Sequence, residues 1–172
     1  MTTVNRVVGR VMLGLAGLSV CGQTMAQTLG EPGMIEVVVA VELTCPSCAQ
    51  GLERRLARLD HVTQVEIQGD EGRVVLGVEP GTNVALEDVW DVIRNAGFTP
   101  AGISLTAIGR LTDVNGEPGL ALADDTIFVL AGDRVGALSD AARLALVRVT
   151  GEVSLATDGG AAVLTIGQLD VP

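Results

Sequence analysis

The sequence predicts an α+β protein in which a βαββαβ sandwich precedes a small, mainly β barrel domain. Between residues 35 and 105, stretches of β-branched residues alternate with two stretches whose apolar residues recur at helical spacing. After residue 105, short apolar stretches are separated by Gly, Asn, Asp and Pro, a pattern typical of short strands and turns. We therefore expect the chain to divide near Pro100, into a domain at 34–103 and a β-rich domain at 104–172.

The start of the chain resembles a secretory signal over residues 1–26. Arg6 and Arg10 provide positive charge, Val11–Val20 is apolar, and the segment ends at the small residue Ala26. The apolar stretch is about half of the roughly twenty residues that a bilayer span requires. We predict removal of residues 1–26, a linker at 27–33, and export across the inner membrane to the periplasm.

Cys21 leaves a second interpretation of this segment open. Leu18-Ser19-Val20-Cys21 resembles the box of bacterial lipoproteins, in which the cysteine carries the lipid. That box prefers Gly, Ala or Ser directly before the cysteine, where this chain has Val20. Lipid attachment at Cys21 is therefore the second alternative, and a buried N-terminal helix is the third.

Composition excludes some partners. The chain has no lysine, and after Ala26 it carries nine arginines against twenty-one acidic residues. Such a surface repels phosphate backbones, so nucleic acid is not an expected partner. Cations and basic proteins suit it better, although acidity also serves merely to keep a protein soluble.

The strands and helices of the first half are predicted from the spacing of apolar residues, which differs between strands and helices. A strand is predicted at Ile35–Val41, a second one around Val65 and Ile67, and a third at Arg73–Val78 after a turn at 69–72. A first helix is predicted between the first two strands because apolar residues recur at four and three positions, namely Leu52, Leu56 and Leu59.

A second helix and a fourth strand complete this half. The helix is predicted from the spacing of Leu86, Val89, Trp90 and Ile93, with Thr82 or Asn83 as its N-cap and Gly97 at its end. A strand resumes at 101–105. The order β-α-β-β-α-β is that of the split βαβ, or ferredoxin-like, sandwich.

Cys45 and Cys48 are the candidate site residues. They open the first helix, and Pro46 suits its first turn. A helix N-terminus favours thiolates, and two thiolates suit either a soft metal ion or a dithiol/disulfide couple. Without further soft ligands the pair favours a near-linear ion, Cu(I) or Hg(II), whereas structural zinc prefers four ligands. The one histidine, His61, is expected about 18 Å away beyond the helix and is not predicted to be a ligand.

Residues 35–103 resemble the heavy-metal-associated domain of copper chaperones, metal-ATPase N-terminal domains and periplasmic mercury-binding proteins. The resemblance rests on Cys-x-x-Cys at the helix start, on the leucines along that helix, and on the motifs His61-Val62-Thr63-Gln64-Val65 and Ala96-Gly97-Phe98. It implies that Cys45 and Cys48 bind the metal and that Phe98 shields it. It also implies a partner that is a metal-transporting membrane protein or another metal-binding domain.

The chain departs from this family beside the cysteines. Glu42 and Leu43 stand where the family usually has Gly and Met, and the lysine common near the thiolates of copper chaperones is missing. Leu43 can fill the volume of the family methionine. Glu42 adds bulk and negative charge, and it is either an additional oxygen ligand or a plain exposed carboxylate.

Two alternatives use the same cysteines. Cys45-Pro46-Ser47-Cys48 also resembles the motif of thioredoxin-like thiol-disulfide oxidoreductases, although these usually have an aromatic residue where this chain has Thr44. The second alternative is that the oxidised pair forms a local disulfide without metal-binding or redox activity, in a structural or interaction protein.

The second half predicts five strands and one helix. Strands are expected at 105–111, 120–122, 127–130, 146–155 and 162–169, with a turn at 115–119 and a helix from Ser139. This order loosely resembles an OB-fold. A nucleic-acid groove requires basic and aromatic residues, and this half has one aromatic residue, Phe128. Its loop carboxylates Asp124, Asp125 and Asp133 are expected to be solvated.

The sequence therefore predicts an exported carrier of one soft metal ion and not an enzyme. Cys45 and Cys48 are expected to hold Cu(I) first, then Hg(II), with Zn(II) or Cd(II) after these. The carrier would sequester the ion or transfer it by thiolate exchange. The alternatives remain a thiol-disulfide oxidoreductase and a structural protein with an inert disulfide.

Overall fold

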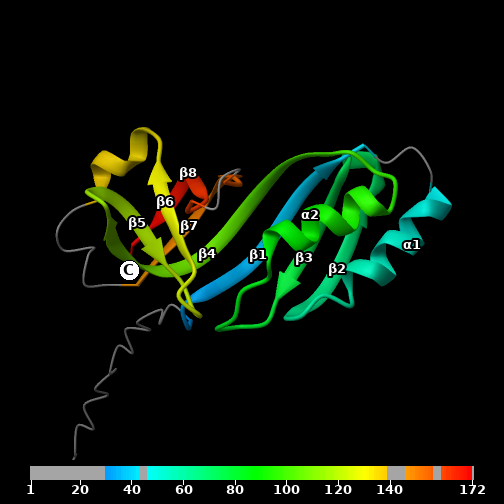
Figure 1. The fold of residues 1–172 in the computed structure, drawn as a ribbon, viewed down its shortest axis with the longest axis horizontal. Helices are drawn as coiled ribbons and strands as arrows, with labels where there is room; N and C mark the ends of the chain where they lie inside the picture. The colour runs from blue at the N-terminus through cyan, green and yellow to red at the C-terminus, as the bar shows by residue number, and fades with distance from the viewer. Residues whose placement is uncertain (1–29, 43–45, 139–145, 157–159, 172) are drawn as a thin grey trace, which may run out of the picture.

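The computed structural model describes residues 30–42, 46–138, 146–156 and 160–171 (Figure 1). Within these residues the strands are β1 (Gly33–Val41), β2 (Val62–Gln68), β3 (Arg73–Val78), β4 (Pro100–Val114), β5 (Glu117–Ala121), β6 (Ile127–Ala131), β7 (Leu146–Ser154) and β8 (Val163–Asp170). The helices are α1 (Pro46–Leu56) and α2 (Leu86–Asn95), with 3-10 turns η1 (Gly69–Glu71) and η2 (Asp133–Ala137). No helix among the described residues is long and apolar enough to cross a membrane.

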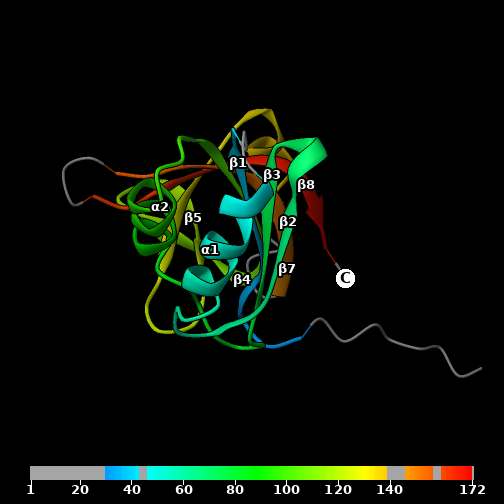
Figure 2. The same cartoon turned by 90° about the vertical axis from the view of Figure 1, so that its right-hand side faces the viewer.

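The first half confirms the predicted β-α-β-β-α-β order. Its strands lie in the order β2-β3-β1-β4, and all neighbours are antiparallel. α1 and α2 lie against the same face of this sheet, as Figures 1 and 2 show from two sides. This is the arrangement of a ferredoxin-like sandwich.

The core of this half lies between the sheet and the two helices. Alternate residues of the strands face the helices because side chains in a strand point to opposite faces in turn. The fully buried side chains are Val37, Val39, Val74, Leu76 and Leu105 from the strands and Leu52, Leu56, Val89 and Ile93 from the helices. Burying each such side chain contributes about 1.5–3 kcal/mol. The predicted burial of Leu52 and Leu56 in the first helix, and of Val89 and Ile93 in the second, is thereby confirmed.

β4 is a single long strand that belongs to both halves. The separate strands expected at 101–105 and 105–111 are continuous, since β4 has no break between Pro100 and Val114. It pairs with β1 along its first part, with β5 along its last part, and with β7 from Ile103 to Arg110. β4 would otherwise be an edge strand of the first sheet, but its second edge is paired with β7.

The strands from β4 to β8 form a closed, barrel-like ring. β4 pairs with β5, β5 with β6, β6 with β8, β8 with β7, and β7 with β4. The pair β6–β8 is parallel and the others are antiparallel. A closed ring leaves no free strand edge within it. The mainly β character predicted for this half is confirmed.

Three local predictions are wrong. Neither Thr82 nor Asn83 caps α2, because the helix begins later and its N-cap is Ala85, which makes no side-chain capping bond. Leu59 lies beyond α1, in turns that follow Leu56. The turn after β4 takes only Asn115 and Gly116, so the rest of the predicted 115–119 turn lies in β5. An Asn-Gly pair suffices because it suits a two-residue hairpin.

Two other local predictions have different outcomes. Gly97 ends α2 as predicted: its φ is +89°, its N–H donates to the carbonyl oxygen of Arg94, and the N–H of Phe98 donates to that of Ile93. These two backbone hydrogen bonds together form a Schellman motif. The helix predicted from Ser139 falls in residues 139–145, which lie outside the described part of the chain.

Candidate metal site

The predicted cysteines stand where β1 gives way to α1. β1 ends at Val41, Glu42 is exposed, and α1 begins at Pro46. Cys48 is the third residue of α1 and therefore lies in its first turn, as predicted. Cys45 and Leu43 belong to residues 43–45, outside the described part, and the side chains of residues 46–48 are likewise not described. The sequence prediction that Cys45 and Cys48 form one site therefore stays a prediction.

α1 is fixed by its inner face and by one contact with α2. Leu52 and Leu56 are completely buried beneath it. On its outer side, Nη1 of Arg55 donates to the carbonyl oxygen of Asn95 at the end of α2, at 3.4 Å. These contacts fix the helix, and thus the backbone of Cys48, relative to the sheet.

The segment after α2 reaches the same edge of the sheet as the end of β1. Val41 pairs with Pro100, the first residue of β4, and the N–H of Val41 donates to the carbonyl oxygen of Gly72 at 2.8 Å. Phe98, two residues before Pro100, is therefore held near the point at which β1 ends. This position is consistent with the shielding role that the family resemblance implies for Phe98.

Phe98 and Trp90 pack against the core without being fully buried. Together they border a cavity of about 470 Å³, which is lined by Trp90, Arg94, Gly97, Phe98, Thr99 and Pro100. The core roles predicted for both aromatic side chains are thus only partial, because each keeps an exposed part.

His61 lies at the other end of α1 from Cys48. Its backbone has a φ of +66°, its carbonyl oxygen accepts from the N–H of Glu79 at 2.8 Å, and its Nδ1 lies 3.4 Å from Oε2 of Glu79. His61 therefore contacts Glu79, the residue that directly follows β3. His61 thus follows the first helix, as predicted, and its exclusion as a ligand stays a prediction.

The carboxylates of the loops form no metal cluster where the structure describes them. Asp124, Asp125 and Asp133 are all exposed, as expected for solvated side chains. In the described ranges, no three His, Cys, Asp or Glu side chains are gathered so that they could hold a metal ion. Glu42 is exposed as well, which fits a plain surface carboxylate.

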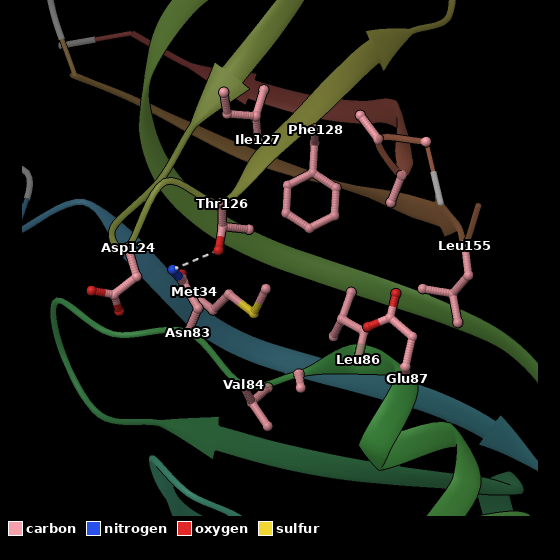
Figure 3. Close-up of a pocket in the computed structure, with 14 residues that line it drawn as sticks. Met34, Asn83, Val84, Leu86, Glu87, Asp124, Thr126, Ile127, Phe128 and Leu155 are labelled. Carbon is pink, nitrogen blue, oxygen red and sulfur yellow. Dashed lines mark hydrogen bonds between the residues drawn. The ribbon is translucent and has the colours of Figure 1, made fainter. Parts of the chain in front are cut away.

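Sequence reasoning missed a cavity at the junction of the two halves. It lies between the start of β1, the segment before α2 and the turn between β5 and β6 (Figure 3). Asn83 connects these parts, because its Nδ2 donates to the carbonyl oxygen of Ala123 at 2.6 Å. Asn83 and Ala123 are 40 positions apart, so no local pattern could reveal the contact.

Comparisons with known proteins find a matching family model and similar solved structures. Residues 38–99 match the family model of the heavy-metal-associated domain. Among curated proteins, none matches the chain. Two solved structures are similar: a copper transporter domain from yeast in its apo and Cu(I)-loaded states, and the apo heavy-metal-associated domain of the copper chaperone for superoxide dismutase.

Both similarities cover part of this chain and most of the other. The yeast domain is 24% identical, with a TM-score of 0.35, over 38% of this chain and 90% of its own. The chaperone domain is 15% identical, also with a TM-score of 0.35, over 56% of this chain and 83% of its own. The family model of the heavy-metal-associated domain thus matches residues 38–99, within the segment whose sequence resembles that domain.

Proposed function

We propose that this protein binds one soft metal ion between Cys45 and Cys48 and transfers it to a partner by thiolate exchange. The proposal rests chiefly on one observation: Cys48 lies in the first turn of α1, inside the segment that matches the heavy-metal-associated domain. Two thiolates favour Cu(I), then Hg(II), over Zn(II) and Cd(II), which prefer more ligands.

Transfer requires only ligand substitution. A thiolate of the partner binds the ion as one cysteine of this chain leaves, and repeating the step moves the ion completely. The metal keeps its oxidation state, and each departing thiolate can take up the proton that the incoming thiol releases. The cargo therefore needs no catalytic side chain on this protein, in agreement with a carrier that is not an enzyme.

The partner that suits this exchange is a metal-transporting membrane protein or another metal-binding domain. We further propose that the protein acts in the periplasm after removal of residues 1–26. Protein isolated from that compartment should begin at Gln27, whereas a chain that still begins at Met1 would contradict the export proposal.

The barrel is proposed to be OB-like and to serve as a docking surface. Five strands that close on the first of them support the fold assignment. A role with nucleic acid is not part of the proposal, since the chain lacks lysine and is strongly acidic.

A competition titration tests the metal-binding proposal. The reduced protein is titrated with Cu(I), Hg(II) and Zn(II) against strong chelators, beside Cys45→Ser and Cys48→Ser. We expect one soft ion per chain, bound most tightly as Cu(I) or Hg(II), and a loss of affinity of more than about 100-fold in each variant, because one of two ligands is gone.

Two control variants sharpen this test. Ser47→Ala changes the residue between the cysteines without removing a thiol, and His61→Ala removes the only imidazole; both should bind the ion as the parent does. If no soft ion binds with a dissociation constant below micromolar, the metal-binding proposal is wrong. Rapid disulfide exchange with a reporter substrate would instead favour the oxidoreductase.

A further inference from the structure

The junction of the two halves contains a cavity that the metal-carrier function does not use. Its volume is about 430 Å³, which lies in the range of small-molecule sites. Its walls come from distant parts of the sequence: the start of β1, the residues around the start of α2, the turn and strand at β6, and Leu155 with residues 160–162 (Figure 3). Such a cavity forms only when both halves are assembled.

The charge around this cavity is negative. Glu87 and Asp124 line it, both are exposed, and Figure 3 shows them on opposite sides of Met34. No arginine is among the lining residues, and the chain has no lysine. Anions are therefore repelled, and a cation is attracted.

The cavity also offers apolar contacts. Ile127 lines it and is 39% exposed; in the described part of the chain, only three large apolar side chains are exposed by 38% or more. Leu155 also lines it and is half-buried, whereas Phe128, a further lining residue, is only 3% exposed. A bare hydrated ion would not use these surfaces, whereas a ligand with an aliphatic body would cover them.

Asn83 lines the cavity, and its amide is held in one orientation. Its Nδ2 donates to the carbonyl oxygen of Ala123 and, at 3.2 Å, to Oγ1 of Thr126. The amide cannot be reversed, because a carbonyl oxygen would then face another. Its Oδ1 is consequently fixed, buried, and without a partner among the described residues. A buried acceptor without a donor is costly, but this oxygen is closed to solvent and therefore fixes the position of Asn83 without contacting a ligand itself.

The turn between β5 and β6 places the carboxylate of Asp124 beside Asn83. Asp124 and Asp125 both have left-handed backbones, with φ of +52° and +57°. Thr126 closes the turn by donating its N–H to the carbonyl oxygen of Ala123 at 3.1 Å. Figure 3 shows Asp124, Asn83 and Thr126 together at one end of the cavity, with Leu155 at the other.

We propose that this cavity binds a small alkylammonium ion. Its ammonium group pairs with the carboxylate of Asp124, beside Asn83 and Thr126, and its aliphatic chain lies along Ile127 and Leu155. Glu87 adds to the negative potential without contacting the ammonium. This binding is independent of the cysteine pair.

NMR titration of the full chain with hexylammonium chloride tests the proposal. Hexanol and hexanoate, at the same ionic strength, have the same aliphatic chain without the positive charge. We expect saturable shifts of the Thr126, Ile127 and Ala162 amides, with affinity in the order hexylammonium, hexanol, hexanoate. Absence of saturable shifts, or equal binding of hexanoate, would overturn the proposal.

Two neighbouring variants test the role of charge. Asp124→Asn removes the carboxylate at the cavity, and Asp125→Asn removes an adjacent exposed carboxylate that does not line it. Asparagine tolerates the left-handed backbone of both positions. We expect Asp124→Asn to weaken hexylammonium binding about three- to fivefold, as for an exposed charge pair, and Asp125→Asn to weaken it less. Equal effects of the two variants would contradict the proposed position of the ammonium.

Two further titrations distinguish a free amine from a lysine side chain of another protein, and binding in the cavity from metal binding. Nα-acetyl-lysine methylamide presents the same alkylammonium group as a lysine of another protein would, so its affinity relative to hexylammonium distinguishes a free amine from a protein side chain. The Cys45→Ser/Cys48→Ser double variant should bind hexylammonium unchanged. Loss of binding in that variant would contradict the independence of the two sites, whereas failure of metal binding would leave this result untouched.

Discussion

Gly102 and Gly109 lie in the same strand but have opposite surroundings. A Cβ atom added at Gly109 would lie 2.6 Å from the carbonyl oxygen of Ala121 and 2.8 Å from Cγ of Leu120. A Cβ atom at Gly102 would meet nothing within 4 Å. The absence of a side chain at Gly109 is therefore what allows β4 and β5 to approach closely where the ring of strands closes.

We predict that Gly109→Ala lowers the free energy of unfolding by about 2–3 kcal/mol, because backbone must shift to admit the methyl group. Gly102→Ala, in the same strand, should change it by less than about 0.5 kcal/mol. Chemical denaturation of both variants measures the difference. Equal stability of the two would show that the close approach at Gly109 is not present in solution.

The same scale shows which residues a sequence can assign. Gly97 was predictable because a glycine after an amphipathic stretch is the usual helix end. Asn83 was assigned wrongly, since an asparagine before such a stretch is typical of an N-cap. Its amide instead bonds to Ala123 and Thr126, 40 and 43 positions away. A tertiary contact thus displaced a local preference, and the cavity beside Asn83 was unpredictable for the same reason.

At the scale of elements, the two helices use glycine in different ways. Gly51 lies inside α1, and Gly97 follows α2 with a φ of +89°. At neither position would a Cβ atom meet another group within 4 Å. The effects of alanine at these positions are therefore conformational and not steric.

We predict opposite effects of alanine in the two helices. Gly51→Ala should raise the free energy of unfolding by about 0.5–1 kcal/mol, because glycine loses more backbone entropy inside a helix. Gly97→Ala should lower it by about 1 kcal/mol, because alanine disfavours the left-handed backbone of the Schellman motif. Thermal unfolding followed by circular dichroism measures both. A destabilised Gly51→Ala would mean that α1 does not extend through this residue.

The positions of the strands in the sequence were easier to predict than the pairing of one strand with another. Alternation of apolar and polar residues gave the positions of β3, β7 and β8 closely, because one face of each strand is buried. Alternation states which face is buried but not which strand lies alongside. The parallel pairing of β6 with β8, and the pairing of β7 with β4, depend on contacts between distant segments and could not be predicted from it.

At the scale of the whole molecule, the two halves share both a strand and a core. β4 contributes to the first sheet and to the closed ring. The buried apolar side chains form one continuous cluster that extends from Leu52 under α1 to Leu164 in β8. Separate unfolding of the second half would expose apolar surface in the first. The predicted boundary between 103 and 104 falls inside β4.

We therefore predict that the two halves unfold in one cooperative transition. Trp90, the only tryptophan, reports on α2 in the first half, whereas far-UV circular dichroism reports mainly on strands of both halves. The two signals should change at the same denaturant concentration. In addition, Gly109→Ala should lower the midpoint reported by Trp90 as much as the midpoint reported by circular dichroism, because loss of the ring would remove β7 from the edge of β4. If the Trp90 midpoint stays fixed while the circular dichroism transition divides into two, the halves are independent domains and the boundary at 103 is a true domain boundary.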